Sequence, residues 1–215
     1  MTPNKEDYLK CIYEIGTETS KITNKEIAQR MQVSPPAVTE MMKKLLAEGL
    51  LIKDKSRGYV MTEAGMQVTS DLYRKHRLIE VFLVNHLGYA TDQIHEEAEV
   101  LEHTVSDQFV ERLDKLLDFP TVCPHGGTIP KPGQLLVEDF QQTLQGTEEM
   151  GAYTVVRVQD DYQLLTFLEQ HHIGVGTELE LIHFDPFTQT YQVQMADKEL
   201  SLGPTVTPHI YVEKK

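Results

Sequence analysis

The sequence is poor in cysteine, in positive charge and in long apolar runs. Only two of its 215 residues are cysteines, too few for a disulfide framework, so both thiols are expected to be reduced. No apolar run approaches the about 20 residues that span a bilayer. The opening MTPNKEDYL lacks the basic and apolar regions of a signal peptide. Together these absences predict a cytoplasmic protein with no membrane partner.

Positive charge is scarce on average but unevenly distributed. The chain has 20 Lys and Arg against 33 Asp and Glu, a net charge of −13, which as an average argues against nucleic-acid binding. Residues 1–75, however, hold 12 basic and 10 acidic side chains (net +2). Residues 76–150 hold 4 and 14 (net −10), and residues 151–215 hold 4 and 9 (net −5). A mildly basic first segment therefore precedes a strongly acidic remainder, and the length suits two or three small domains.

Helix start signals mark the first segment. An amphipathic helix is expected over residues 4–16. In TNKEIAQRM, Thr23 and Glu26 have the spacing of a capping box. In SPPAVTEMMKKLLAEGL, Ser34 is a good N-cap and Pro35 suits the first turn, where its missing N–H would have no partner anyway. LLIKDKSRGYVMT then predicts two strands around a basic turn, so the whole pattern indicates a winged helix-turn-helix.

The N-terminal end of the helix that follows Ser34 is expected to enter the major groove of DNA. Small residues there could approach base edges, and basic residues on the helix and wing could meet phosphates. Basic residues cluster in this segment, which favours DNA binding over the alternative of a protein-interaction module. The predicted contacts are Ser34, Pro35, Pro36 and Thr39 for the bases, and Lys43, Lys44, Lys53, Lys55 and Arg57 for the backbone.

The stretch IHEEAEVLEH, residues 94–103, holds two histidines and four glutamates. A helix over residues 94–109 would carry an apolar stripe ending at Phe109, with a His/Glu face beside it. Carboxylates held together repel each other, and a divalent cation would relieve that repulsion. The alternative is a solvated acidic surface. The residues on this face are His95, Glu99, Glu102 and His103.

Two further groups could supply metal ligands. His76 and Glu80 lie one helical turn apart, a spacing at which two side chains converge, although ordinary surface pairs share it. In CPHGGTIPKPG, Cys123 and His125 flank a proline and could both bind a metal, whereas a lone cysteine is more often a small buried hydrophobe. Asp7, on the first helix, is another candidate.

The last part of the chain changes to strand patterns. AYTVVRV, TELELIHF and TYQVQM read as strands between Gly, Asp-Pro and Lys-Glu turns, and LGPTVTPHIYVE is expected to add a short strand pair. The prediction is a mainly α protein with a small β part. Its expected domains are a winged helix-turn-helix over 1–72, a helical domain over 73–140, a linker over 141–151 and a small β-barrel over 152–215.

With these motifs the sequence resembles the diphtheria toxin repressor family of metal-dependent transcriptional regulators, and most of all its manganese-responsive branch. The resemblance rests on EDYLKCIYEI, VSPPAVTEMMKKLLAEGLL, RKHRLIEVFL, HEEAEVLEHTVSD and CPHGGTIP. It implies a homodimer that binds double-stranded DNA at a palindromic operator and has no small-molecule substrate. Residues 73–140 would form the dimerisation and metal-binding domain, and the C-terminal barrel would be SH3-like (FeoA-like).

The resemblance also implies two metal sites. One would use Asp7, Glu99, Glu102 and His103. The other would use His76, Glu80 and His95, with Cys123 and His125 in a nearby loop and Asp160 from the barrel. On sequence grounds, Gln159 or Asp161 could take the place of Asp160.

Two departures from the family bear on the metal. Glu99 stands where iron-responsive members carry a cysteine, and its harder oxygen ligand favours Mn²⁺. Lys10 replaces a glutamate of shorter manganese-responsive members, which argues against their paired-metal arrangement. The thiol of Cys123, in contrast, favours Fe²⁺, Zn²⁺ or Cd²⁺ as substitutes.

The expected function is that of a Mn²⁺-responsive repressor of genes for metal uptake and homeostasis. The metal would tie the first helix to the acidic helix and so fix the spacing of the two recognition helices in the dimer. One alternative is a metal-independent winged-helix regulator or interaction module. Another is a metalloenzyme built on the His/Glu cluster, against which stands the absence of an H-E-x-x-H motif.

Overall fold

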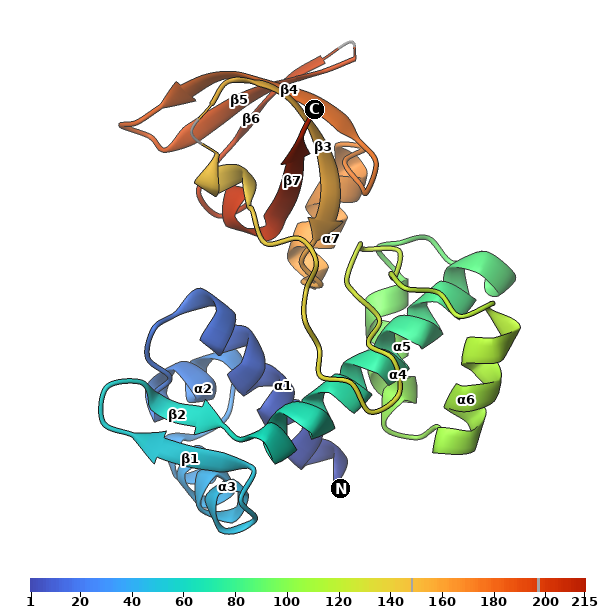
Figure 1. The fold of residues 1–215 in the computed structure, drawn as a ribbon. Helices are drawn as coiled ribbons and strands as arrows, with labels where there is room; N and C mark the ends of the chain where they lie inside the picture. The colour runs from blue at the N-terminus through green and yellow to red at the C-terminus, as the bar shows by residue number, and fades with distance from the viewer. Residues whose placement is uncertain (148, 197) are drawn as a thin grey trace. The chain divides into compact units, whose positions relative to one another are not determined.

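The computed structural model describes residues 1–147, 149–196 and 198–215, drawn as a ribbon in Figure 1. The chain forms two compact units, Met1–Lys75 with Pro130–Leu136, and His76–Ile129 with Val137–Lys215. The long helix α4 (Glu63–Leu87) contributes residues to both. None of the described helices is long and apolar enough to cross a membrane.

The first unit contains a helix-turn-helix followed by a two-stranded wing. Its elements are α1 (Pro3–Glu18), α2 (Asn24–Arg30), α3 (Pro35–Ala47), β1 (Leu51–Asp54) and β2 (Gly58–Met61). The capping box predicted at the start of α2 is present, since Thr23 and Glu26 exchange backbone and side-chain hydrogen bonds. Ser34 caps α3 by accepting a hydrogen bond from the backbone N–H of Ala37 at 3.4 Å.

The core of this unit consists of one apolar face from each helix. Its fully buried members include Leu9, Ile12, Ile27, Val38 and Leu45, each 0% exposed. Burial of such a side chain contributes about 1.5–3 kcal/mol. These contacts hold α3 against α1 and α2 while its opposite face stays in solvent.

The wing is attached to the segment that precedes α2. Ile22 donates its N–H to the carbonyl of Arg57 at 2.9 Å and accepts the N–H of Tyr59 at 3.3 Å. Gly58, between them, has φ +76°, and a Cβ there would lie 2.0 Å from the carbonyl oxygen of Ile22. Only glycine permits this approach, because it has no Cβ and adopts positive φ without cost.

The second unit begins with the C-terminal half of α4 and continues with α5 (Ile94–Glu102) and α6 (Asp107–Leu116). The continuous helix predicted over 94–109 is wrong. Helix α5 ends at Glu102, and Ser106 caps a separate helix by accepting the N–H of Phe109 at 3.2 Å. Phe109 is 45% exposed instead of lying in a buried stripe.

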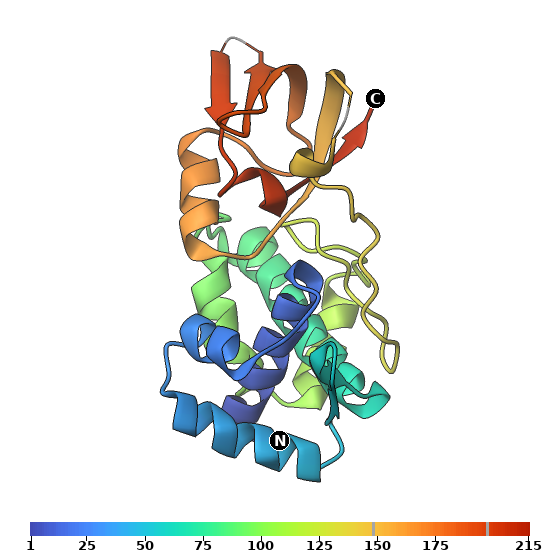
Figure 2. The ribbon, with the colours of Figure 1, turned by 90° about the vertical axis from the view of Figure 1, so that its left-hand side faces the viewer.

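The C-terminal part of this unit is a five-stranded antiparallel sheet with one helix (Figures 1 and 2). The strand order is β6-β5-β4-β3-β7, an SH3-like arrangement whose sheet, over the described residues, is not closed by a ladder between β6 and β7. Bulges interrupt β3 between Val155 and Arg157 and β4 between Leu181 and His183, and bulges increase strand twist. The elements are β3 (Gly151–Val158), α7 (Tyr162–Gln170), β4 (Glu178–Asp185), β5 (Thr190–Met195), β6 (Lys198–Leu202) and β7 (Ile210–Lys214).

The structure corrects two details predicted for this region and adds one helix. The closing segment LGPTVTPHIYVE is not a strand pair, since β6 and β7 lie at opposite edges of the sheet and pair with β5 and β3. Lys198 and Glu199 do not form a turn but begin β6. Helix α7 was not predicted at all. Short 3-10 helices at Leu144–Gly146 and Thr207–His209 complete the unit, and position 148 of the proposed 141–151 linker lies outside the described residues.

Candidate metal centre

Helix α4 places His76 and Glu80 in the interior of the second unit, where both residues are 0% exposed. Their i,i+4 spacing brings His76 Nε2 to 3.2 Å from Glu80 Oε1. Among the described residues, Glu80 Oε2 has no hydrogen-bond partner although it is buried. A buried carboxylate oxygen without a donor is costly, which makes it a strong candidate ligand for a cation.

The loop that carries Cys123 and His125 turns back on itself beside Glu80. Cys123 exchanges backbone hydrogen bonds with Gly126 and Gly127, each 2.9 Å long. His125 Nε2 lies 3.0 Å from the carbonyl oxygen of Thr91, which can only accept, so Nε2 carries the proton. In a neutral imidazole the lone pair then sits on Nδ1. This is how a metal-binding histidine is oriented by an outer partner.

The Nδ1 of His125 faces two carboxylates. It lies 2.5 Å from Asp160 Oδ1 and 3.1 Å from Glu80 Oε1, yet neither Nδ1 nor Oδ1 makes a hydrogen bond of acceptable geometry within the described part of the chain. The three groups therefore lie close together but are not aligned as hydrogen-bond partners. Such convergence is expected of ligands arranged around an ion.

Asp160, among the three barrel residues considered from the sequence, is the one that reaches this point. Gln159 Oε1 instead lies 2.5 Å from His209 Nδ1. Asp161 caps α7 by accepting the N–H of Leu164 at 2.9 Å. The N–H of Val158 donates to the carbonyl of His125 at 2.9 Å, which holds the end of β3 beside that loop. Asp160 therefore lies within reach of His125, while its two neighbours make contacts inside the C-terminal domain.

Two overlapping donor groups result, both including Glu80. In each group the ligand atoms all lie within 4.8 Å of one another. The ring centroids of His76 and His95 are 5.1 Å apart, and Cys123 is buried beside His125. The first group is His76, Glu80, His95 and Asp160, and the second is Glu80, Cys123 and His125.

The charges in the cluster are mutually dependent. Burial alone would raise the pKa of Glu80, but His76 and His125 outweigh it and hold that pKa well below the usual value. Burial would lower the pKa of His125, yet Asp160 and Glu80 raise it far above the usual range. Burial, followed by the charge of Glu80, raises the pKa of the Cys123 thiol to about 12. The pKa values of Glu80 and His125 are therefore set by their neighbours in the cluster, since burial alone would move each in the opposite direction.

Helix α5 carries the residues predicted from IHEEAEVLEH, and one of them also contacts a residue of the other predicted site. Glu102 is buried, and its Oε2 lies 2.5 Å from His76 Nδ1, so His76 contacts a glutamate that the sequence assigned to the other site. His103 Nε2 is 3.4 Å from Glu102 Oε1. Glu99 Oε1 lies 3.7 Å from His95 Nε2, and the Glu99 side chain is 49% exposed. Asp7 belongs to the first unit, and its ligation remains a prediction.

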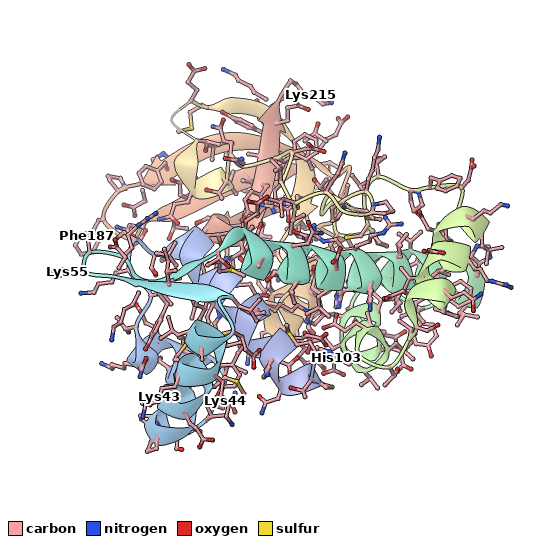
Figure 3. All side chains as sticks on the ribbon, turned by 60° about the horizontal axis from the view of Figure 1, so that its bottom comes forward. Lys43, Lys44, Lys55, His103, Phe187 and Lys215 are labelled. Carbon is pink, nitrogen blue, oxygen red and sulfur yellow. The ribbon has the colours of Figure 1, made fainter. Side chains whose placement is uncertain are left out.

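The predicted DNA-contacting residues all lie on the surface of the first unit. Lys43 and Lys44 project from α3, and Lys55 stands at the tip of the wing (Figure 3). The hydroxyl of Thr39 donates to the carbonyl of Pro35 at 3.0 Å and accepts from Asn24 at 3.0 Å. Lys44 pairs with Glu40 at 2.8 Å. The whole set is exposed: Ser34, Pro35, Pro36, Thr39, Lys43, Lys44, Lys53, Lys55 and Arg57.

A winged helix-turn-helix joined to a helical unit with a buried His/Cys/carboxylate cluster defines a DNA-binding protein under metal control. Comparison with family models agrees over most of the chain. Residues 1–59 match the iron dependent repressor N-terminal DNA binding domain, residues 62–131 its metal binding and dimerisation domain, and residues 142–214 the FeoA domain. The chain belongs to the iron-dependent repressor family, whose members are metal-dependent DNA-binding repressors.

Individual relatives support the same conclusion. The chain is 30% identical over 191 residues to the diphtheria toxin repressor of Corynebacterium diphtheriae, covering 84% of each protein. It is 59% identical to a solved structure of the manganese regulator SloR, with a TM-score of 0.91 and full coverage of both chains. It is 62% identical to ScaR with bound Zn²⁺, with a TM-score of 0.94 and coverage of 98% of this chain and 99% of that one.

Proposed function

We propose that this protein is a manganese-responsive repressor whose DNA binding depends on a divalent cation held around Glu80. The observation that carries the proposal is the convergence of donors from α4, α5, the 123–125 loop and the end of β3 on this buried carboxylate. The ligands would be His76, Glu80, His95, Cys123, His125 and Asp160. Genes for metal uptake are the expected targets, and the cytoplasm is the expected compartment.

The residues present fit a divalent cation. Carboxylate oxygens and imidazole nitrogens suit Mn²⁺, and the single thiol also admits Fe²⁺, Zn²⁺ or Cd²⁺. The related ScaR structures with Zn²⁺ and Cd²⁺ support such substitution. A bound cation would neutralise the opposed carboxylates of Glu80 and Asp160. The Oε2 of Glu80, which accepts no hydrogen bond from the described residues, would then gain a partner.

A second ligand group remains part of the proposal on the strength of the sequence resemblance. It consists of Asp7, Glu99, Glu102 and His103. The contact between His76 and Glu102 supports a connection between the two groups, because one imidazole faces a carboxylate of each. A cation that also bound Asp7 would restrict the DNA-binding segment, and only one spacing of two recognition helices matches two half-sites.

Exposed apolar residues on the second unit support homodimerisation. Isolated exposed apolar side chains are normal, but several on adjoining elements mark an interface. Here they lie on α5, on α6 and in the segment that follows α6, within the region matched by the dimerisation domain. The residues are Val100, Phe109, Leu116, Phe119 and Val122, which are 43–66% exposed.

The proposal is tested by measuring operator affinity of chelator-stripped protein titrated with Mn²⁺ at fixed salt, since phosphate contacts make affinity salt-dependent. Wild type should bind its own promoter fragment only as metal is added, and Glu80→Gln should not respond. Equal binding by the metal-free protein would instead favour a metal-independent winged-helix regulator.

A further inference from the structure

A second buried cluster of charges lies beside the proposed metal centre and contains none of its ligands. Glu138 Oε1 lies 2.6 Å from Arg77 Nη2 and 3.2 Å from Arg157 Nη1. The three side chains are only 5–13% exposed. Neither the family resemblance nor the site residues considered above gives these residues a role.

Each arginine is adjacent in sequence to proposed ligands. Arg77 follows His76 on α4, one turn before Glu80. Arg157 lies near the end of β3, which leads directly to Asp160. Glu138, in the segment between α6 and β3, therefore joins the helix that carries two ligands to the strand that leads to another.

The remaining contacts make this connection rigid. Glu138 Oε2 accepts the backbone N–H of Thr128 at 3.0 Å, and Arg77 Nη1 donates to the Thr128 carbonyl at 2.5 Å. Arg157 stacks over the ring of Tyr211 at 3.5 Å. Arg77 and Glu138 thus also bind the backbone of Thr128, the residue that follows the 123–127 loop.

That loop fits against both arginines without spare room. A Cβ at Gly127 would lie 2.6 Å from the guanidinium carbon of Arg77. A Cβ at Gly126 would lie 2.1 Å from the carbonyl oxygen of Val156 and 2.8 Å from Cα of Arg157. The backbone of His125 is fixed to the same strand, since its carbonyl accepts the N–H of Val158 at 2.9 Å.

We propose that Glu138 is a positioning residue for the metal centre. Its contacts fix α4, the 123–127 loop and the end of β3 in the arrangement that brings Glu80, His125 and Asp160 together. This inference rests on the proposed function. With a neutral residue at position 138, Arg77 and Arg157 would lose the buried carboxylate that they share, and removal of one partner of a buried ion pair is strongly destabilising. The distances among the three ligands would then change although each ligand is intact.

The test uses the full chain, stripped of metal and titrated with Co²⁺ alone. Calorimetry gives the affinity, and the visible absorption spectrum at saturation reports the geometry of the ligands. Glu138→Gln should bind Co²⁺ about 10–100-fold more weakly, as loss of an outer-shell partner does, and should give a changed spectrum at saturation. Glu138→Asp, which keeps the charge, should recover part of both.

The matched control is Glu18→Gln, which removes the carboxylate of another arginine pair, Glu18–Arg30 (2.7 and 2.9 Å). It should leave Co²⁺ affinity and spectrum unchanged. A merely structural role for Glu138 would lower stability yet give the wild-type spectrum once metal is saturating, and that result overturns the inference. If wild type itself binds no Co²⁺, the proposed function fails instead.

If Glu138→Gln does not fold, Arg157→Gln serves as the test variant, because it keeps the Arg77–Glu138 pair and removes the ion pair to β3 together with the stacking on Tyr211. It should weaken Co²⁺ binding by about tenfold, the lower end of the outer-shell range, and should change the spectrum. Wild-type affinity and spectrum in this variant would also overturn the inference.

Discussion

Replacement of Gly58 by alanine tests how the wing is held. The new Cβ would lie 2.0 Å from the carbonyl oxygen of Ile22, so the strand must move away and the two hydrogen bonds to Ile22 are lost. The left-handed φ of +76° costs an L-residue about 1–2 kcal/mol, and each hydrogen bond contributes about 1 kcal/mol. The variant should therefore lose about 3–4 kcal/mol of unfolding free energy.

Gly49→Ala is the matched control. Gly49 has nearly the same φ, +71°, but no atom lies within 4 Å of its added Cβ. It should lose only the conformational part, about 1–2 kcal/mol. Changes in unfolded-chain entropy are the same for both substitutions, so the difference between the variants isolates the contact with Ile22.

The assay is urea unfolding of the metal-free protein, combined with hydrogen exchange of the amides of Ile22 and Tyr59. Those two amides should lose protection in Gly58→Ala and keep it in Gly49→Ala. Equal destabilisation by both variants, with protection at Ile22 unchanged, would refute the argument that the close approach attaches the wing.

Three further predictions concern the metal, the DNA and the thiol. Glu80→Gln should lower the number of Mn²⁺ ions bound per chain more than His95→Gln does, because Glu80 belongs to both donor groups. Elemental analysis after desalting measures the bound metal. Equal losses in the two variants would contradict the assignment of Glu80 as a ligand shared by both groups. Lys55→Gln should reduce the slope of log DNA affinity against log salt concentration by about 2 for a dimer, since each phosphate contact contributes about 0.9. The control Lys115→Gln, on α6, should leave the slope unchanged. An unchanged slope for Lys55→Gln would exclude a contact between the wing and a phosphate. Burial, followed by the charge of Glu14, raises the pKa of the Cys11 thiol to about 12. The protonated thiol therefore contributes fully to the free energy of unfolding below the unfolded-state pKa of about 9. This contribution is lost as the pH rises from about 9 towards 12. Iodoacetamide labelling followed by peptide mass spectrometry should show Cys11 unreactive at pH 8, and labelling at the rate of an exposed cysteine would contradict its burial.

Local chemistry made the first unit predictable. Thr23, Glu26 and Ser34 each act within four residues of their own position, so the caps could be read directly from the sequence. Helix α7 carried comparable signals, an Asp161 cap and apolar residues at Leu164, Leu165 and Leu168, but the strand pattern around it obscured them. The break after Glu102 was missed for a different reason, because helical periodicity continues in register across the Ser106 cap.

The family resemblance named the residues that gather around Glu80, but the contacts between elements could not be derived from the sequence pattern. Periodicity places His76 beside Glu80, whereas the contact between His76 and Glu102 depends on how α5 packs against α4. The choice of Asp160 over its neighbours depends on the contact of Gln159 with His209 and on the cap that Asp161 provides for α7. Glu138 gives no signal at all in the sequence, since its partners are residues 77 and 157.

The ligands around Glu80 come from sequence positions as distant as 76 and 160, so an unfolded chain does not present them together. A cation that binds only the folded form stabilises it by mass action, by about 2.7 kcal/mol at a free concentration 100 times the Kd. On the proposed assignment, metal starvation would then act twice. Each folded molecule would lose the signal for DNA binding. A larger fraction of the molecules would also be unfolded and open to proteolysis, so the protein would be degraded faster.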